Sequence, residues 1–261
     1  MIELHCMDNL ELMKTIEGST VDLIYCDILY GTGRKFKDYQ DLKPIRSEIE
    51  AHYIPRLKEM HRILKPTGSI YLQMDTKINH WLRCIMDDIF GYSNFRNEIV
   101  WDYGGQSRKS DISNKHDLLI RYTKSETFTY NTQYKPHTER SKKEYRHSHN
   151  GEMCARTKRG DTYYYSPLNP NGTNITSVWS DITLLTPSSK ERNIVGYDTQ
   201  KPKALIERII KASSNEGDLV ADFYLGSGTT CEVALDFNRN FIGCDINKRA
   251  VEIAKSRCRL D

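Results

Sequence analysis

The sequence contains no long hydrophobic run, no signal-peptide pattern and no paired-cysteine motif. No stretch of its 261 residues approaches the ~18 apolar residues that a membrane-spanning helix needs. Its seven cysteines are scattered and make neither a Cys-x-x-Cys pair nor a zinc-ligand spacing. We therefore expect a cytoplasmic protein with reduced thiols, no membrane partner and no metal site.

A strong excess of one charge is also missing. The 38 Lys and Arg residues nearly balance the 35 Asp and Glu residues, which gives a net charge of +3 at pH 7. Overall charge therefore does not indicate binding to nucleic acid.

The apolar pattern is typical of an α/β protein, and the length is sufficient for one sizeable core with an inserted lobe. Segment 54–64 has apolar residues at helical spacing, and Pro66 to Gly68 should stop this helix. Pro202 should open another helix, with Leu205, Ile206, Ile209 and Ile210 on its buried face. Helices are expected at 9–16, 54–64, 81–90, after 202 and at 230–235, and strands at 2–6, 21–26, 69–73, 97–101, 117–122, 128–130, from 219 and at 241–244.

The most informative segment runs from Leu219 to Thr230, where an apolar run leads into a glycine-rich turn and then a helix-compatible stretch. This order begins a Rossmann-type unit, in which backbone N–H groups at a helix N-terminus meet a polar ligand. A later strand ends in Asp245, whose carboxylate could accept hydrogen bonds from ribose hydroxyls. The turn alone is weak evidence for a cofactor site, because the full Gly-x-Gly-x-x-Gly fingerprint is absent.

A second apolar run, 21–26, ends in Asp27-Ile28-Leu29-Tyr30. The carboxyl end of a strand is where doubly wound sheets bind ligands. Together the two segments resemble the amino-methyltransferases of DNA, whose catalytic tetrapeptide is usually Asp-Pro-Pro-Tyr and whose cofactor turn is usually Asp-Pro-Phe-x-Gly-Ser-Gly-Thr-Thr, matched here by 222–230. The element Thr-Gln-Lys-Pro is present unaltered at 199–202.

The resemblance covers residues 1–130 and 196–261. A catalytic segment that precedes the cofactor turn is the circularly permuted order of the beta class, common in bacterial restriction–modification systems. The resemblance implies a Rossmann-like α/β S-adenosylmethionine-dependent methyltransferase fold, circularly permuted, with an inserted target-recognition region. Residues 1–130 would form the catalytic half, 131–195 the inserted region and 196–261 the cofactor-binding half.

Residues 131–195 have weak periodicity, more basic than acidic residues, and interleaved tyrosines such as Tyr163 to Tyr165. This composition suits contacts to phosphates and base edges of DNA, and a solvated insertion is the alternative. The partners that the resemblance implies are double-stranded DNA, a cognate restriction endonuclease and a second copy of the chain in a homodimer.

The implied reaction moves a methyl group from S-adenosyl-L-methionine to N6 of an adenine flipped out of the duplex. Asp27 and the Ile28 carbonyl would accept the two N–H groups of the amine, and Tyr30 would stack on the base. The alternatives are a capping or turn carboxylate at Asp27 and a core or rim aromatic at Tyr30. Ile28 and Leu29 replace the family's two prolines, so the loop loses φ restriction and gains two N–H groups.

The implied cofactor residues come from both ends of the chain. Asp8 would meet the adenine amino group, unless it only caps the helix from Asn9. Phe223 replaces the usual proline of the cofactor turn. The loop from Gly31 to Lys43, with Arg34, Lys35 and Lys37, would close over DNA or cofactor, or be a mobile surface loop. The full set is Asp8, Asp27, Thr199, Gln200, Lys201, Asp222, Tyr224, Gly226, Ser227, Gly228, Thr229, Asp245 and Ile246.

Three other functions stay open. Methylation of cytosine N4 on the same scaffold is the nearest, although Asp rather than Ser at position 27 favours adenine as a family tendency. The others are a DNA-binding regulator that has lost turnover and a methyltransferase for RNA or a small molecule. No Pro-Cys dipeptide occurs, which argues against the cysteine-nucleophile chemistry of C5-cytosine methyltransferases.

Overall fold

The computed structural model describes residues 1–35, 40–105, 109–195, 197 and 199–260 and divides into two compact units. The first unit comprises Met1–Asn131 and Ser177–Asp261, and the second comprises Thr132–Thr176. The interval 131–195, expected as an inserted region, therefore contains residues 177–195 that belong to the first unit.

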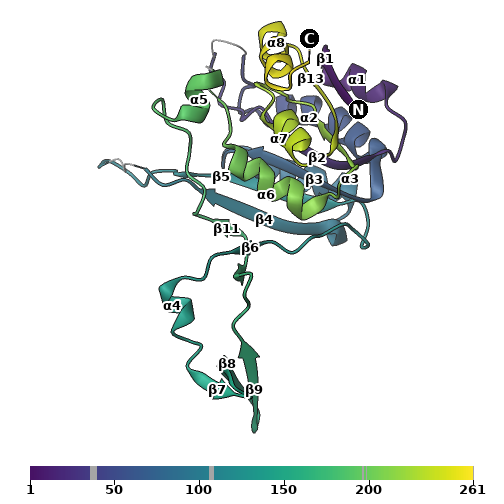
Figure 1. Ribbon diagram of the computed structural model, residues 1–261. Helices are drawn as coiled ribbons and strands as arrows, with labels where there is room; N and C mark the ends of the chain where they lie inside the picture. Colours follow the sequence, from purple (N-terminus) through teal and green to yellow (C-terminus); the bar gives the residue numbers. More distant parts are fainter. Residues whose placement is uncertain (36–39, 106–108, 196, 198, 261) are drawn as a thin grey trace. The chain divides into compact units, whose positions relative to one another are not determined.

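An eight-stranded, mostly parallel sheet forms the centre of the first unit, in the order β1-β13-β12-β2-β3-β5-β4-β11 (Figure 1). Strand β5 is antiparallel to both of its neighbours, β3 and β4. This arrangement confirms the predicted α/β class, and the sheet is mixed because β5 is antiparallel. The strands are β1 (Ile2–Cys6), β2 (Val21–Asp27), β3 (Leu64–Met74), β4 (Phe95–Asp102), β5 (His116–Thr123), β11 (Val178–Trp179), β12 (Leu219–Asp222) and β13 (Asn240–Asp245).

Helices cover both faces of this sheet (Figure 1). On one face lie α1 (Asn9–Thr15), α2 (Arg46–Ile63) and α3 (Asn79–Phe90), and on the other lie α6 (Lys203–Ser213) and α7 (Thr229–Asp236), with α8 (Lys248–Arg257) beside α7. The unit also contains η1 (Tyr92–Asn94) and α5 (Lys190–Val195). Among the described residues, no helix is long and apolar enough to cross a membrane.

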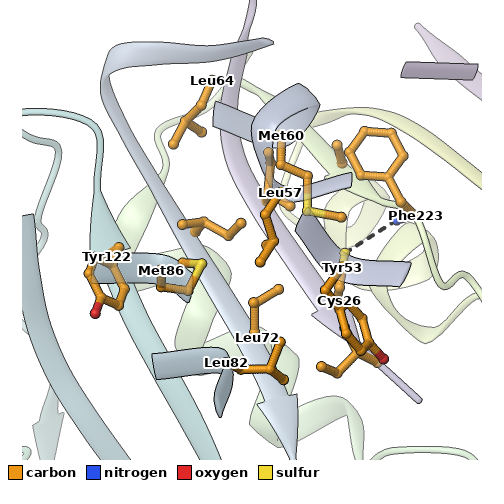
Figure 2. Packing of buried hydrophobic residues seen from close by; sticks show 14 of the residues in the cluster. Cys26, Tyr53, Leu57, Met60, Leu64, Leu72, Leu82, Met86, Tyr122 and Phe223 are labelled. Atoms are coloured by element: carbon orange, nitrogen blue, oxygen red, sulfur yellow. Dashed lines mark hydrogen bonds between the residues drawn. The ribbon is translucent and has the colours of Figure 1, made fainter. Parts of the chain in front are cut away.

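The two hydrophobic layers follow from the alternation of side chains along the strands. In β2, Ile24 and Cys26 belong to the cluster that Tyr53, Leu57 and Met60 of α2 complete (Figure 2). The Cys26 sulfur also accepts a hydrogen bond from the Phe223 backbone N–H at 3.5 Å, which ties β2 to the end of β12. The opposite layer contains the predicted buried face of α6: Leu205, Ile206, Ile209 and Ile210.

Helix α2 begins eight residues before the predicted start at Ile54. Ile49 and Tyr53 are buried at i, i+4 spacing and extend the apolar face of the predicted segment toward the N-terminus. Pro55 lies inside the helix, where it cannot donate a backbone hydrogen bond. The apolar stripe continues through this position, so tertiary packing outweighs the local cost of proline.

The prediction of a strand at 128–130 is wrong. Among the described residues this segment has no strand partner; its Thr129 N–H donates to the Thr67 carbonyl at 3.0 Å. The Phe128 ring lies instead under two guanidinium groups, 4.5 Å from Arg96 and 5.2 Å from Arg121. Its aromatic residues therefore serve cation–π contacts rather than a sheet ladder.

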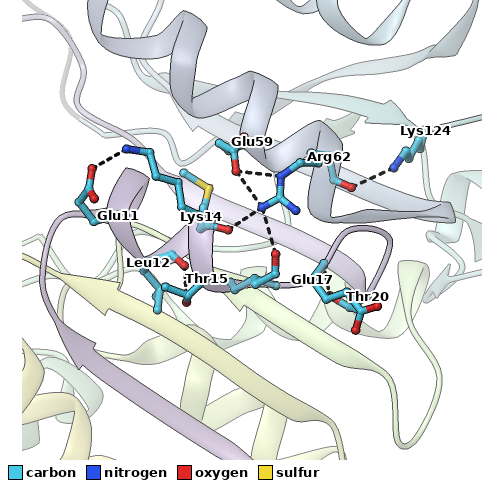
Figure 3. A network of polar contacts seen from close by, with 11 residues as sticks. Glu11, Leu12, Lys14, Thr15, Glu17, Thr20, Glu59, Arg62 and Lys124 are labelled. Atoms are coloured by element: carbon cyan, nitrogen blue, oxygen red, sulfur yellow. Dashed lines mark hydrogen bonds and ion pairs between the residues drawn. The ribbon is translucent and has the colours of Figure 1, made fainter.

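Arg62 of α2 fixes the C-terminal end of α1 (Figure 3). Its Nη2 donates to the carbonyls of Met13 and Ile16 at 2.8 and 3.0 Å, which satisfies acceptors that the helix end leaves free. Glu59 accepts from the same guanidinium at 2.8 Å, and Lys124 donates to the Arg62 carbonyl at 3.2 Å. This network holds α1 against α2 and so sets the position of the residues at its N-terminal end.

The second unit contains a three-stranded antiparallel sheet of β7 (His147–His149), β8 (Glu152–Arg159) and β9 (Thr162–Pro167). A two-stranded sheet pairs β6 (Tyr134–Lys135) with β10 (Thr173–Asn174), and α4 (Glu139–Lys142) is a single short helix. Most side chains of the second unit are exposed.

Candidate functional site

The strand connections diverge between β12 and β2. Strand β12 leads through α7 to β13 on one side, whereas β2 leads through α2 to β3 on the other, and the two strands are parallel neighbours. Open α/β sheets bind ligands at such a switch point, beyond the carboxyl ends of the strands. A cavity of about 480 Å³ lies there and is lined by residues from both ends of the chain.

Nearly all of the predicted site residues line this cavity. They are Asp8, Asp27, Ile28, Tyr30, Thr199, Gln200, Lys201, Asp222, Tyr224, Gly226, Ser227, Thr229, Asp245 and Ile246. Gly228 is the exception: its φ is +78°, and a Cβ there would lie 2.5 Å from the Ala254 Cβ. This glycine therefore lets the turn pack against α8 rather than facing the cavity.

Asp27 ends β2 and has two charged or polar side-chain partners. Its Oδ1 accepts from the Tyr30 hydroxyl at 2.9 Å, and its Oδ2 accepts from Lys201 Nζ at 2.5 Å. Burial raises the pKa of Asp27, and the Lys201 charge opposes that rise. A carboxylate offers about four lone-pair sites, so both oxygens can accept a further N–H from a ligand.

The loop after Asp27 is held by hydrogen bonds in place of the prolines. The Ile28 N–H donates to the Gln73 carbonyl at 3.1 Å and prolongs the β2–β3 pairing, a bond that proline could not make. The Leu29 carbonyl accepts from the Tyr53 hydroxyl at 2.8 Å. The Ile28 carbonyl has no partner in the part of the chain that the structure describes, so it remains available as an acceptor beside Asp27.

Tyr30 lies between two carboxylates. Its hydroxyl is 2.9 Å from Asp27 Oδ1 and 2.7 Å from Asp117 Oδ2, and Lys201 Nζ lies 5.3 Å from the centre of its ring. The ring is partly buried against the core, so the hydroxyl contacts fix its orientation at the cavity wall.

The glycine turn after β12 is organised by two carboxylates. Asp222 Oδ1 accepts from the Tyr224 N–H at 3.0 Å, and its Oδ2 accepts from the Thr230 hydroxyl at 2.6 Å. Burial raises the pKa of Asp222 to about 7 despite these bonds. Asp245, at the end of β13, accepts from the Gly226 N–H at 2.9 Å, which draws the turn toward the second strand.

Asp8 caps α1, which is one of the two roles that the sequence left open, and its contact with a cofactor stays a prediction. Its Oδ1 accepts from the Leu10 N–H at 2.8 Å, so it caps α1. Its Oδ2 accepts from Arg56 Nη2 at 2.7 Å, and the residue also lines the cavity. Capping thus holds this carboxylate at the cavity wall.

Several residues of the cavity lining carry no signal that was recognised in the sequence. His52 and Arg56 reach the cavity from α2 at i, i+4 spacing; His52 lies upstream of the predicted helix and Arg56 lies inside it. His52 Nε2 is 3.0 Å from the Tyr224 hydroxyl, and burial together with the Arg56 charge lowers the pKa of His52 to about 4. The imidazole is therefore neutral at pH 7.

Asp41 is the second missed feature, because it organises the loop after Tyr30. The residue is buried, and its carboxylate accepts from the Gly31 and Thr32 N–H groups at 3.1 and 2.7 Å. Lys37, expected in the same loop, lies outside the described residues, and Arg34 and Lys35 do not line the cavity.

Two features of the cavity fit an adenosine-containing, amino-acid-bearing ligand such as S-adenosylmethionine. The Gln200 Oε1 is buried without a hydrogen-bond partner and can accept from an ammonium group. Ile246 is 72% exposed beside Asp245, which offers an apolar surface next to a carboxylate. Among the described residues no cluster of His, Cys, Asp or Glu could hold a metal ion.

Comparison with known proteins identifies one family. The family model N6_N4_Mtase, described as DNA methylase, matches residues 21–256. The Type II methyltransferase M.HpaI of Haemophilus parainfluenzae is 33% identical over 97% of this chain and 72% of its own. Two solved structures share the fold: the M1.HpyAVI–SAM complex (TM-score 0.61, 18% identity, 98% of both chains) and the cytosine-N4-specific PvuII DNA methyltransferase (TM-score 0.68, 16% identity, 98% of this chain and 86% of that one).

Proposed function

We propose that this chain, which belongs to the N6/N4 DNA methylase family, transfers a methyl group from S-adenosyl-L-methionine to N6 of adenine in double-stranded DNA. Family membership establishes the coarser activity, a DNA methyltransferase of the restriction–modification type that uses S-adenosylmethionine. The choice of adenine over cytosine is our proposal, and Asp27 supports it.

The observation that carries the proposal is the pair of acceptors at the end of β2. The Asp27 carboxylate faces the cavity, and the Ile28 carbonyl beside it has no hydrogen-bond partner among the described residues. An exocyclic amine is a weak nucleophile because its lone pair is delocalised into the ring. Two acceptors for its two N–H groups localise that lone pair and aim it at the methyl donor.

The remaining roles follow from the position of each side chain. Tyr30 offers a ring face to a flipped base, which offsets part of the few kcal/mol that unstacking costs. We assign Gln200, Lys201, Asp222 and the glycine turn to the methionine end of the cofactor, and Asp245, Ile246 and Asp8 to its adenosine end. When bound, the cofactor supplies an activated methyl group on a sulfonium.

The finer classification is also part of the proposal. The order of Asp27 before the glycine turn supports the circularly permuted beta class. A homodimer and a cognate restriction endonuclease stay predictions of the family resemblance.

Expression in cells that lack DNA methylation, followed by mass spectrometry of the digested DNA, tests the proposal. We expect N6-methyladenine from the chain and none from cells with an empty vector. N4-methylcytosine would keep the acceptor mechanism and contradict the proposed base. No modified base from a chain that binds S-adenosylmethionine would favour the DNA-binding regulator.

We further propose that the second unit contacts the target DNA. On one face of its β8–β9 ribbon, Arg156 lies opposite Tyr165 and Lys158 opposite Tyr163. The Arg156 guanidinium lies 4.6 Å from the Tyr163 ring centre, which keeps the two side chains extended together. A two-stranded ribbon fits the major groove, and such cations bind phosphates.

Replacing Arg156 and Lys158 together by alanine should weaken DNA binding and lower its salt dependence. The slope of log affinity against log salt should fall by roughly one per lost phosphate contact, about two in all. Fluorescence anisotropy with a DNA duplex over a salt series measures both quantities. Lys14→Ala, which removes an exposed lysine of α1 paired with Glu11, is the control. An unchanged slope in the double variant would remove the ribbon from the DNA interface.

A further inference from the structure

Asp117 is a buried carboxylate next to the proposed reaction centre. It lies in β5 with 7% of its surface exposed. Its Oδ2 is 2.7 Å from the Tyr30 hydroxyl and accepts from Gln73 Nε2 at 2.9 Å. In the part of the chain that the structure describes, no Lys, Arg or His forms an ion pair with it.

Three oxygens link Asp27 at the cavity wall to Asp117 in β5 through two short contacts. Asp27 Oδ1, the Tyr30 hydroxyl and Asp117 Oδ2 are separated by 2.9 and 2.7 Å, both within hydrogen-bond distance. A hydroxyl carries one proton and can donate to only one of two carboxylates. The second short contact becomes a hydrogen bond when one additional proton is present on one of the two carboxylates.

We propose that Asp117, through the Tyr30 hydroxyl, receives the proton that Asp27 takes from the amino group of the substrate. This inference rests on the proposed function and adds a residue to it. As the N–CH₃ bond forms and the S–CH₃ bond breaks, the amine N–H proton passes to Asp27 and forms an O–H bond.

The second step returns Asp27 to its starting state. The proton on Asp27 moves to the Tyr30 oxygen while the Tyr30 hydroxyl proton moves to Asp117. Asp27 is again a carboxylate, Tyr30 is neutral, and Asp117 is a carboxylic acid. The proton thus ends on a carboxylate buried in β5, and no free charge is created on Tyr30.

The two carboxylates differ in the groups that contact them. Lys201 neutralises Asp27 at 2.5 Å, whereas Asp117 is contacted by neutral donors, Gln73 and the tyrosine hydroxyls. Asp117 is therefore a buried carboxylate with which no described Lys, Arg or His forms an ion pair. The titratable and charged groups around the relay are Asp27, Lys201, Tyr25, Tyr30, Tyr103, Asp75 and Asp222.

Asp117→Asn, which keeps the shape of the side chain, tests the relay. Asp117 carries a like charge that raises the pKa of Asp27, so its loss should move the acid limb of kcat to lower pH, by about one pH unit. The plateau of kcat should fall about tenfold with an unchanged KM for DNA. On a Tyr30→Phe background, Asp117→Asn should cause no further loss, because the connection is already broken.

Asp87→Asn is the matched control, because Asp87 accepts from the Tyr122 hydroxyl in the same unit but outside the cavity. Its pH profile should equal that of the native chain. An unchanged acid limb in Asp117→Asn, or additive losses with Tyr30→Phe, would show that Asp117 only supports the structure and would overturn the relay.

A second readout does not depend on turnover. The ¹³C-carboxyl resonance of Asp27, assigned with Asp27→Asn, should titrate at lower pH in Asp117→Asn than in the native chain. On a Tyr30→Phe background, Asp117→Asn should shift this titration by less. DNA methylation by the native chain together with an unchanged Asp27 titration in Asp117→Asn would overturn the relay alone. If the native chain methylates no DNA, the proposed function fails and the relay fails with it.

Discussion

Asp27→Asn is expected to reduce the methyl-transfer rate about a thousandfold, within the range that positioned acid–base and electrostatic groups supply. The amide that replaces the carboxylate can turn N–H donors toward the amine of the base, where an acceptor is needed. It also loses the negative charge that Lys201 contacts at 2.5 Å. Single-turnover transfer at saturating DNA and cofactor measures this loss without a contribution from binding.

Asp22→Asn is the matched control for this prediction. Asp22 lies near the start of the same strand, β2, and pairs with Lys65 at 2.8 Å, so it too is a carboxylate–lysine pair. Its replacement should leave the transfer rate unchanged, because this end of the strand is remote from the cavity lining. A rate for Asp27→Asn within tenfold of the native rate would remove the carboxylate from the chemistry.

Local patterns predicted the parts of the site that lie at the ends of strands. Asp27 and Asp245 each end an apolar run, and parallel strands place such residues at the same edge of the sheet. The turn at 222–230 could be recognised because its glycines are closely spaced and Asp222 bonds to Tyr224 and Thr230 within the same segment. These features could be predicted because sequence neighbours determine them.

The residues that the sequence did not reveal depend on pairing between distant elements. Asp117 meets Tyr30 only because β5 runs antiparallel beside β3. The apolar run around Asp117 predicts a strand but does not predict whether that strand is parallel or antiparallel to its neighbour. His52 reaches the cavity because α2 begins at Arg46, ahead of the periodic segment. Likewise, the residue types at 128–130 are typical of a strand. In the structure the Phe128 ring instead packs against the guanidinium groups of Arg96 and Arg121.

The departure from the usual prolines illustrates the same limit. From the sequence, Ile28 and Leu29 only loosen the loop after Asp27. In the structure the gained Ile28 N–H binds the Gln73 carbonyl, and Tyr53 holds the Leu29 carbonyl. Hydrogen bonds to β3 and α2 thus fix the loop that proline would fix through its ring, and neither partner is near in sequence.

Asp222→Asn is expected to change how stability depends on pH. The pKa of Asp222 is raised to about 7 in the folded chain, from 3.8 when it is unfolded. Between these values the folded state holds more protons, so the free energy of unfolding falls as pH rises from about 4 to 7. Above that window the loss attributable to this group is about 4 kcal/mol. Asparagine does not titrate, so the variant should lack this decline.

Urea unfolding at pH 5 and pH 8, in the native chain and in Asp222→Asn, measures the difference, because contributions of other groups cancel between the two proteins. Thr230→Val removes the 2.6 Å hydrogen bond that favours the charged carboxylate. The free energy of unfolding should therefore fall by more between pH 5 and pH 8 than in the native chain. Added S-adenosylmethionine brings a positive charge into the cavity and should reduce the decline, because it favours ionised Asp222. Equal changes in native and Asp222→Asn stability between the two pH values would contradict the prediction, and would mean that the folded chain accommodates the Asp222 charge without cost.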